Sequence, residues 1–95
     1  MSKMKFYKYD TADYLKTEKD IKYYLEAVFK DGDPELIASA LGDVARARGM
    51  TKIAKEAKVN RESLYRSLSK TGAPLFKTVN NVVNSLGFRL SVVPA

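Results

Sequence analysis

Residues 50 to 68 read MTKIAKEAKVNRESLYRSL, and this stretch sets the architecture of the chain. Its small and apolar residues have the spacing of the inner faces of two short helices: Ile53, Ala54, Ala57, Leu64 and Leu68. Thr51 is suited to cap the first helix and Asn60 the second, while Val59 packs under the turn between them. The stretch therefore predicts a helix, a three-residue turn and a second helix.

This pattern is typical of a DNA-binding helix-turn-helix over residues 51–68. Ala54 is small, as required where the second helix crosses the first at close range. Lys58 departs from the pattern, because many such motifs have glycine there, and a lysine with positive φ costs about 1 kcal/mol. The alternative is a generic helical hairpin within a bundle.

The exposed side of the second helix is the predicted DNA-reading surface, since Leu64 and Leu68 define its buried side. We expect four of its residues to face DNA, namely Arg61, Ser63, Tyr65 and Arg66. We expect phosphate contacts from the first helix and from a second clamp further on: Thr51, Lys52, Lys55, Lys70 and Lys77. A merely solvated role is the alternative for each lysine.

Three more helices are predicted around this motif. A capping box at Thr17 and Asp20 opens a helix over residues 18–30, and Asp33-Pro34 opens another that ends near Gly49. Pro74 opens the last helix, with Leu75, Val79, Val82, Val83 and Leu86 on its buried face, and Gly87 closes it.

The two ends of the chain lack a helical pattern. Residues 1–16 hold several aromatic side chains without a regular period and are expected to form an N-terminal arm. Residues 88–93 alternate apolar and polar side chains before Pro94, which predicts a short C-terminal β-strand. The predicted fold is thus all-α, with five helices, one short strand and a single domain over residues 1–95.

Charge is distributed unevenly between the halves of the chain. Residues 1–45 hold 7 Lys/Arg against 9 Asp/Glu, whereas residues 46–95 hold 10 against 2, so the net charges are −2 and +8. A strongly basic half favours a polyanionic partner, although a solvated lysine surface gives the same composition. The motif within the basic half makes double-stranded DNA the favoured partner.

Composition argues against catalysis and against insertion into a membrane. The chain has no cysteine and no histidine, which removes thiolate zinc sites, disulfides and the commonest general base. We therefore expect no enzyme activity, no metal and no cofactor. No apolar run approaches the roughly 18 residues of a membrane span, and the basic stretch 1–8 is not followed by a signal core, so we expect a cytoplasmic protein.

The whole chain resembles short antidote proteins of chromosomal and prophage addiction modules, within the lambda-repressor-like helix-turn-helix group related to HigA. The most specific part is residues 40–51, ALGDVARARGMT. Further shared features are Tyr14-Leu15, Tyr24-Leu25-Glu26-Ala27, Gly32-Asp33-Pro34, residues 64–69 (LYRSLS), Gly72, Pro74 and Leu86-Gly87. Lys58 and Ser67 stand where related motifs often hold smaller or apolar residues.

The resemblance implies an antitoxin that neutralises a toxin of the RelE/ParE superfamily and represses their shared promoter. Because one recognition helix reads few base pairs, we expect a homodimer on operator DNA, paired through the ends of the last helix and the strand over residues 88–93. We expect the toxin on the acidic half, with aromatic anchors Phe6, Tyr7, Tyr9 and Tyr14, although these side chains could instead belong to the core. The alternatives are a stand-alone prophage-type regulator without a toxin and a structural or adaptor bundle.

Overall fold

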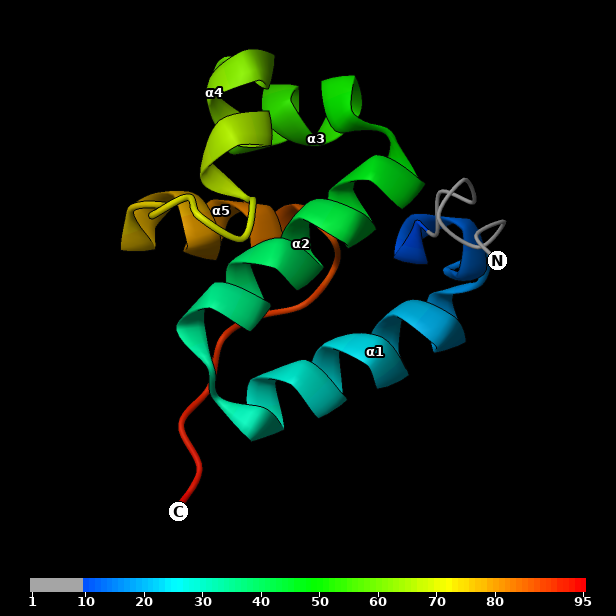
Figure 1. Cartoon of the computed structure of the whole chain (residues 1–95), viewed down its shortest axis with the longest axis vertical. Helices are drawn as coiled ribbons and strands as arrows, with labels where there is room; N and C mark the ends of the chain where they lie inside the picture. Colours follow the sequence, from blue (N-terminus) through cyan, green and yellow to red (C-terminus); the bar gives the residue numbers. More distant parts are fainter. Residues whose placement is uncertain (1–9) are drawn as a thin grey trace, which may run out of the picture.

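The computed structural model describes residues 10–95, and within that range it is all-helical (Figure 1). A 3-10 helix, η2 (Thr11–Tyr14), precedes five α-helices. These are α1 (Glu18–Asp31), α2 (Pro34–Arg48), α3 (Met50–Ala57), α4 (Arg61–Ser67) and α5 (Phe76–Ser85). The predicted five helices are therefore confirmed.

Local capping explains the ends of α1. Thr17 Oγ1 accepts a hydrogen bond from the Asp20 backbone N–H, and the Asp20 carboxylate accepts one in return from the Thr17 backbone N–H, so the predicted capping box is present. The hydrogen bond from the Thr17 backbone lowers the pKa of Asp20. Gly32, at φ 83°, ends α1 in the left-handed conformation that glycine adopts most easily.

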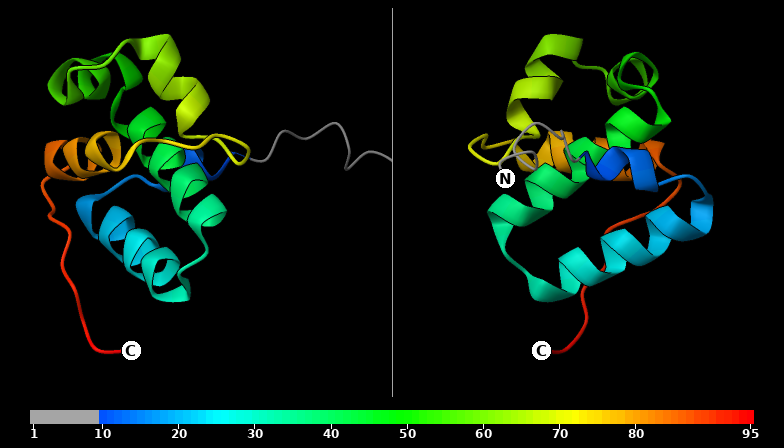
Figure 2. Two further views of the ribbon diagram at one scale, coloured as in Figure 1. Left: turned by 90° about the vertical axis from the view of Figure 1, so that its left-hand side faces the viewer. Right: turned by 45° about the vertical axis from the view of Figure 1, so that its right-hand side comes forward.

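The helix α2 is the centre of the molecule, because it contacts η2, α1, α3 and α5 (Figure 2). Ala40, Leu41, Val44 and Ala45 on α2 are completely buried. They pack in one core with apolar residues from the other helices, including Ile21, Ile53, Leu64 and Val82. In Figure 1, α3 and α4 lie on one side of α2, and α1 lies on the opposite side.

The predicted C-terminal strand is wrong. Among residues 10–95 the structure contains no β-strand, and residues 88–95 run as an extended coil past the α1–α2 pair (Figure 2). Phe88 and Leu90 pack against the helical core, while Val92 and Val93 are 95% and 77% exposed. The alternation of apolar and polar residues over 88–93 therefore reflects a coil that packs one side on the helices. Within the described residues there is no other strand with which it could form a β-sheet.

Two predicted helix starts are also wrong by one or two residues. Gly49, at φ 112°, turns the chain directly from α2 into α3, so that α3 begins at Met50 and Thr51 lies inside it. The helix α5 begins at Phe76, with Leu75 rather than Pro74 immediately before it. Neither α3 nor α5 has a side-chain hydrogen bond at its N-cap.

The backbones of α2 and the end of α4 meet at Gly42. A Cβ atom at this position would lie 2.2 Å from the carbonyl oxygen of Leu68, a distance that no real Cβ contact tolerates. Gly42 is therefore required by the packing of the two helices, although a glycine inside a helix normally weakens it.

Gly42→Ala is expected to destabilise the protein by about 1–3 kcal/mol, because the overlap is with backbone and outweighs the gain in helix propensity. Ser39→Ala, also in α2, is the control and should change the free energy of unfolding by less than about 0.5 kcal/mol. Urea unfolding measures both variants. A Gly42→Ala variant more stable than the wild type would contradict the described contact.

Candidate nucleic-acid interface

The helices α3 and α4 are joined by three residues, Lys58, Val59 and Asn60, as the sequence predicts. Lys58 has φ 60° and ψ 43°. Among the described residues, no other residue except glycine has a positive φ. Its backbone N–H donates to the carbonyl of Lys55, and the N–H of Val59 donates to that of Ala54 at 3.0 Å. These bonds close the end of α3 and turn the chain sharply.

The start of α4 is fixed by Asn60. Its side-chain oxygen accepts hydrogen bonds from the backbone N–H groups of Glu62 at 2.8 Å and Ser63 at 3.2 Å. The predicted cap is therefore confirmed, and it satisfies two N–H groups that the helix itself leaves unpaired.

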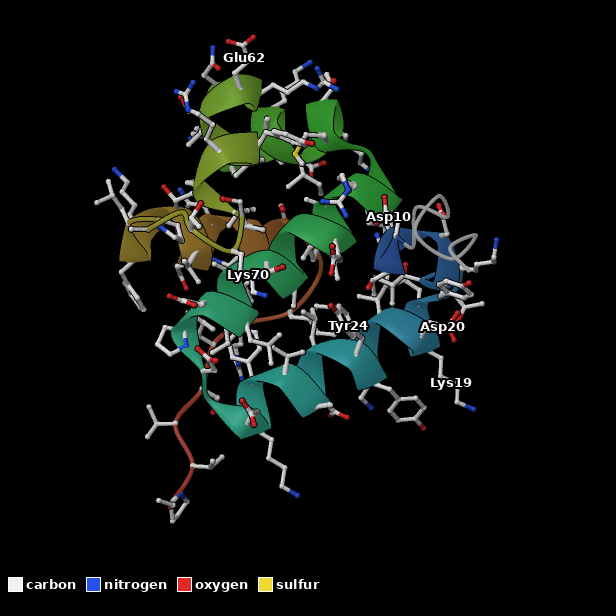
Figure 3. The ribbon with its side chains drawn as sticks, in the orientation of Figure 1. Asp10, Lys19, Asp20, Tyr24, Glu62 and Lys70 are labelled. Carbon is white, nitrogen blue, oxygen red and sulfur yellow. The ribbon has the colours of Figure 1, made fainter. Side chains whose placement is uncertain are left out.

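One side of α4 is buried and the other is open to solvent. Leu64 is completely buried and Leu68 is 3% exposed, as the sequence predicts. The other five residues among the first six of α4 are exposed, namely Arg61, Glu62, Ser63, Tyr65 and Arg66. This end of α4 projects from the molecule, as the position of Glu62 shows (Figure 3).

Four of these side chains line one open depression: Arg61, Glu62, Tyr65 and Arg66. Three of them were predicted to face DNA, and Ser63, the fourth predicted residue, is exposed but does not line the depression. Glu62 was not predicted as a contact, although the same helical period places it on this surface. A carboxylate there can accept a hydrogen bond from the amino group of cytosine.

The loop after α4 is held by a second close approach. A Cβ atom at Gly72 would lie 2.4 Å from the carbonyl oxygens of both Arg66 and Ser67. Together with the contact at Gly42, this fixes the C-terminal end of α4 against its surroundings. The exposed side chains of α4 are therefore carried by a helix whose position is set by backbone packing.

The predicted phosphate contacts fall into two groups. Thr51, Lys52 and Lys55 are exposed on α3, whose first N–H groups lack a side-chain cap. Lys70 and Lys77 are exposed in the loop after α4 and in the first turn of α5. Lys70 lies well away from Glu62 in Figure 3, so the structure does not bring this lysine together with the outer end of α4.

A polar network that the sequence did not reveal joins the acidic half to Arg46. Arg46 donates to the carboxylates of Asp10 at 2.6 Å and Asp43 at 2.8 Å, and the Tyr24 hydroxyl donates to Asp43 at 2.7 Å. The hydrogen bond from Arg46 lowers the pKa of Asp10, so this contact stabilises the fold at neutral pH and is lost as the pH falls through the lowered value. A third ion pair joins Arg48 to Glu18.

The predicted toxin-binding aromatic residues are described only in part. Tyr14, in η2, is 62% exposed. Phe6, Tyr7 and Tyr9 lie outside the described residues. Next to Tyr14, Leu15 is buried in the core and Asp10 caps η2 by accepting from the Ala12 N–H at 3.0 Å.

Residues 5–94 match the family model described as probable addiction module antidote protein. The chain belongs to this family. It is also 45% identical over 84 residues to a protein of Haemophilus influenzae (strain Rd) described as uncharacterized, with 88% of this chain and 87% of that protein covered. No solved structure matches the chain.

The match confirms the antidote family inferred from residues such as 40–51, and it leaves the HigA-like, lambda-repressor-like subtype a prediction. Within residues 10–95, no helix is long and apolar enough to cross a membrane.

Lys58→Gly is expected to be more stable than Lys58→Ala by about 1 kcal/mol, because glycine adopts positive φ without the steric cost that alanine and lysine share. Both variants remove the same charge, so the comparison isolates the backbone. Thermal unfolding monitored by circular dichroism measures the difference. Equal stability of the two variants would show that the turn does not hold residue 58 in this conformation.

Proposed function

We propose that this antidote protein binds operator DNA as a dimer, represses its own operon and neutralises a toxin of the RelE/ParE superfamily. The observation that carries the DNA-binding part is the exposed surface of α4, where Arg61, Tyr65 and Arg66 surround one depression. This surface belongs to the half of the chain with a net charge of +8. The arrangement of α3, turn and α4 supports the HigA-like, lambda-repressor-like subtype.

The α4 surface offers the chemistry needed to read base edges. An arginine donates two parallel hydrogen bonds to O6 and N7 of guanine, and the exposed hydroxyls of Ser63 and Tyr65 can reach bases or phosphates. A helix of this diameter enters the major groove of B-DNA. We therefore assign base reading to α4.

Phosphate contacts on both sides of α4 would position the helix without reading sequence. Thr51, Lys52 and Lys55 are exposed on α3, and the uncapped N–H groups at the start of α3 favour an anion. Lys70 and Lys77 supply a separate clamp after α4. If a dimer neutralises roughly 6 to 10 phosphates, affinity falls by about 10³ to 10⁵ between 50 and 200 mM salt.

Arg61→Ala and Arg66→Ala are each expected to weaken binding to the DNA upstream of the gene by about 1–3 kcal/mol and to relax sequence preference at one position. Lys22→Ala, an exposed change on α1 that removes the same charge, is the control and should have little effect. Titration of matched duplexes with single base changes measures both quantities. If neither arginine variant alters affinity or preference, α4 is not the reading helix.

A dimer is proposed because a single short helix reads few base pairs, whereas two copies engage half-sites about 34 Å apart. Leu75 and Phe76 support this proposal, since they are 73% and 74% exposed just before and at the start of α5. Large apolar side chains that lie together at a surface are typical of an interface. The start of α5 thus replaces the predicted C-terminal strand as the proposed dimer interface.

Phe76→Ser is expected to shift the protein towards monomer and to weaken operator binding, because it removes an apolar side chain from the proposed interface. Val93→Ser, which changes an equally exposed residue of the C-terminal coil, serves as the control. Analytical ultracentrifugation compares the three proteins. A dimer that is unaffected by Phe76→Ser would place the interface elsewhere.

The toxin is proposed to bind the acidic half, leaving the basic half free for DNA, because toxins of this superfamily are usually basic and opposite charge speeds association. Asp10, Glu18 and Asp20 are already engaged, in two ion pairs and a capping box. Asp13 and Tyr14 are both exposed on η2, and we propose them as toxin contacts on the strength of this exposure.

Removal of residues 1–9 together with Tyr14→Ala is expected to abolish toxin neutralisation while operator binding and thermal stability are kept. The truncation stops before Asp10 so that the contact with Arg46 is preserved. Coexpression with the product of the neighbouring gene measures neutralisation. Full neutralisation by this variant would contradict the docking proposal, and loss of the fold would assign these aromatic side chains to the core.

The alternative is a stand-alone transcription regulator without a toxin. It predicts the same binding to operator DNA and the same effects of the arginine variants. Copurification of the two neighbouring gene products separates the alternatives, since the stand-alone regulator would purify alone.

A further inference from the structure

The ion pair between Arg48 and Glu18 joins the end of α2 to the start of α1. Arg48 lies in the last turn of α2 and Glu18 is the first residue of α1. The Glu18 side chain is 75% exposed, and the Arg48 side chain is 25% exposed. The carboxylate is thus bound at the surface, where another anion can replace it.

Arg48 also stands at the entrance to α3. Gly49 alone separates it from Met50, the first residue of that helix, and Thr51 and Lys52 follow on the exposed side. The start of α3 has no side-chain cap, which leaves its first N–H groups available to an anion. These N–H groups and Arg48 lie within the same short stretch of chain. A guanidinium donates two parallel hydrogen bonds to a phosphate as readily as to a carboxylate.

Arg46, one half-turn earlier, has a different role. Its guanidinium contacts two carboxylates, those of Asp10 and Asp43, and the Asp43 side chain is only 14% exposed. Asp43 also accepts from Tyr24. Arg46 is therefore held within the fold, whereas Arg48 has one exposed partner.

We propose that Arg48 contacts a DNA phosphate and that Glu18 is the internal anion that occupies its guanidinium in the free protein. This inference rests on the proposed binding of DNA through α3 and α4. The carboxylate side of the pair is 75% exposed, and holding an exposed carboxylate in one place contributes little stability, so a phosphate displaces the Glu18 carboxylate at small cost. Glu18 lowers DNA affinity by competing with the phosphate for Arg48.

The test is a cycle of Glu18→Gln, Arg48→Gln and the double variant, titrated with a 30-bp duplex of the DNA upstream of the gene and with a random duplex of equal length. Glu18→Gln is expected to tighten binding to both duplexes by about 2- to 5-fold. Arg48→Gln is expected to weaken binding and to reduce the salt slope by about 1 for each protomer. In the Arg48→Gln background, Glu18→Gln should bring almost no gain.

Glu26→Gln is the matched control, because Glu26 is exposed on the same helix and its loss changes the net charge equally. An equal gain from Glu26→Gln, a gain that persists without Arg48, or no gain from Glu18→Gln would each overturn the inference while leaving DNA binding intact. A wild-type protein that binds neither duplex would overturn the DNA-binding proposal as well. Thermal unfolding confirms that every variant is folded.

Discussion

The contact between the α2 backbone at Gly42 and the carbonyl of Leu68 holds the C-terminal end of α4 against the central helix, while α3 supports α4 along its length. With no side chain between them, the two backbones approach more closely than any other residue at position 42 would permit. Leu64 and Leu68 then enter the core beside Leu41 and Val44. The exposed side of α4 follows from this geometry, because a helix pinned on one side presents the opposite side to solvent.

The same central helix connects this surface to the acidic half. Its buried face holds α3 and α5, while its polar residues Asp43, Arg46 and Arg48 contact Tyr24, Asp10 and Glu18 in the N-terminal part of the chain. Apolar packing sets the position of α4, and exposed or half-exposed ion pairs attach η2 and the start of α1. The first kind of contact gives a fixed site, and the second kind depends on pH and on salt.

The helix ends that are fixed by residues close in the sequence could be predicted from the sequence. The capping box at Thr17 and the Asn60 cap involve contacts within a few residues, and both are present in the structure. The buried positions Leu64 and Leu68 followed from helical periodicity for the same reason. The exposed positions on α4 are their complement, so most of the candidate site could also be placed in advance.

Features that depend on distant parts of the chain were missed. The alternation of Phe88 to Val93 has the period of a strand, but a strand exists only when another strand pairs with it, and the helical core takes up Phe88 and Leu90 instead. The ion pairs Arg46–Asp10 and Arg48–Glu18 join residues 36 and 30 positions apart, which no local pattern indicates. Glu62 was also not predicted as a contact, although it lines the same depression as Arg61 and Arg66.

The boundary between the acidic and basic halves falls within α2, and this placement links the two proposed binding surfaces. Asp43 is the last acidic residue of the first half and Arg46 the first basic residue of the second, and they contact each other across one turn of the same helix. Under the proposed function, a toxin that bound the carboxylates of the first half would compete with Arg46 and Arg48, which precede α3 in the chain. Because coupling between two sites is reciprocal, DNA bound at α3 would then change the affinity for the toxin by the same factor.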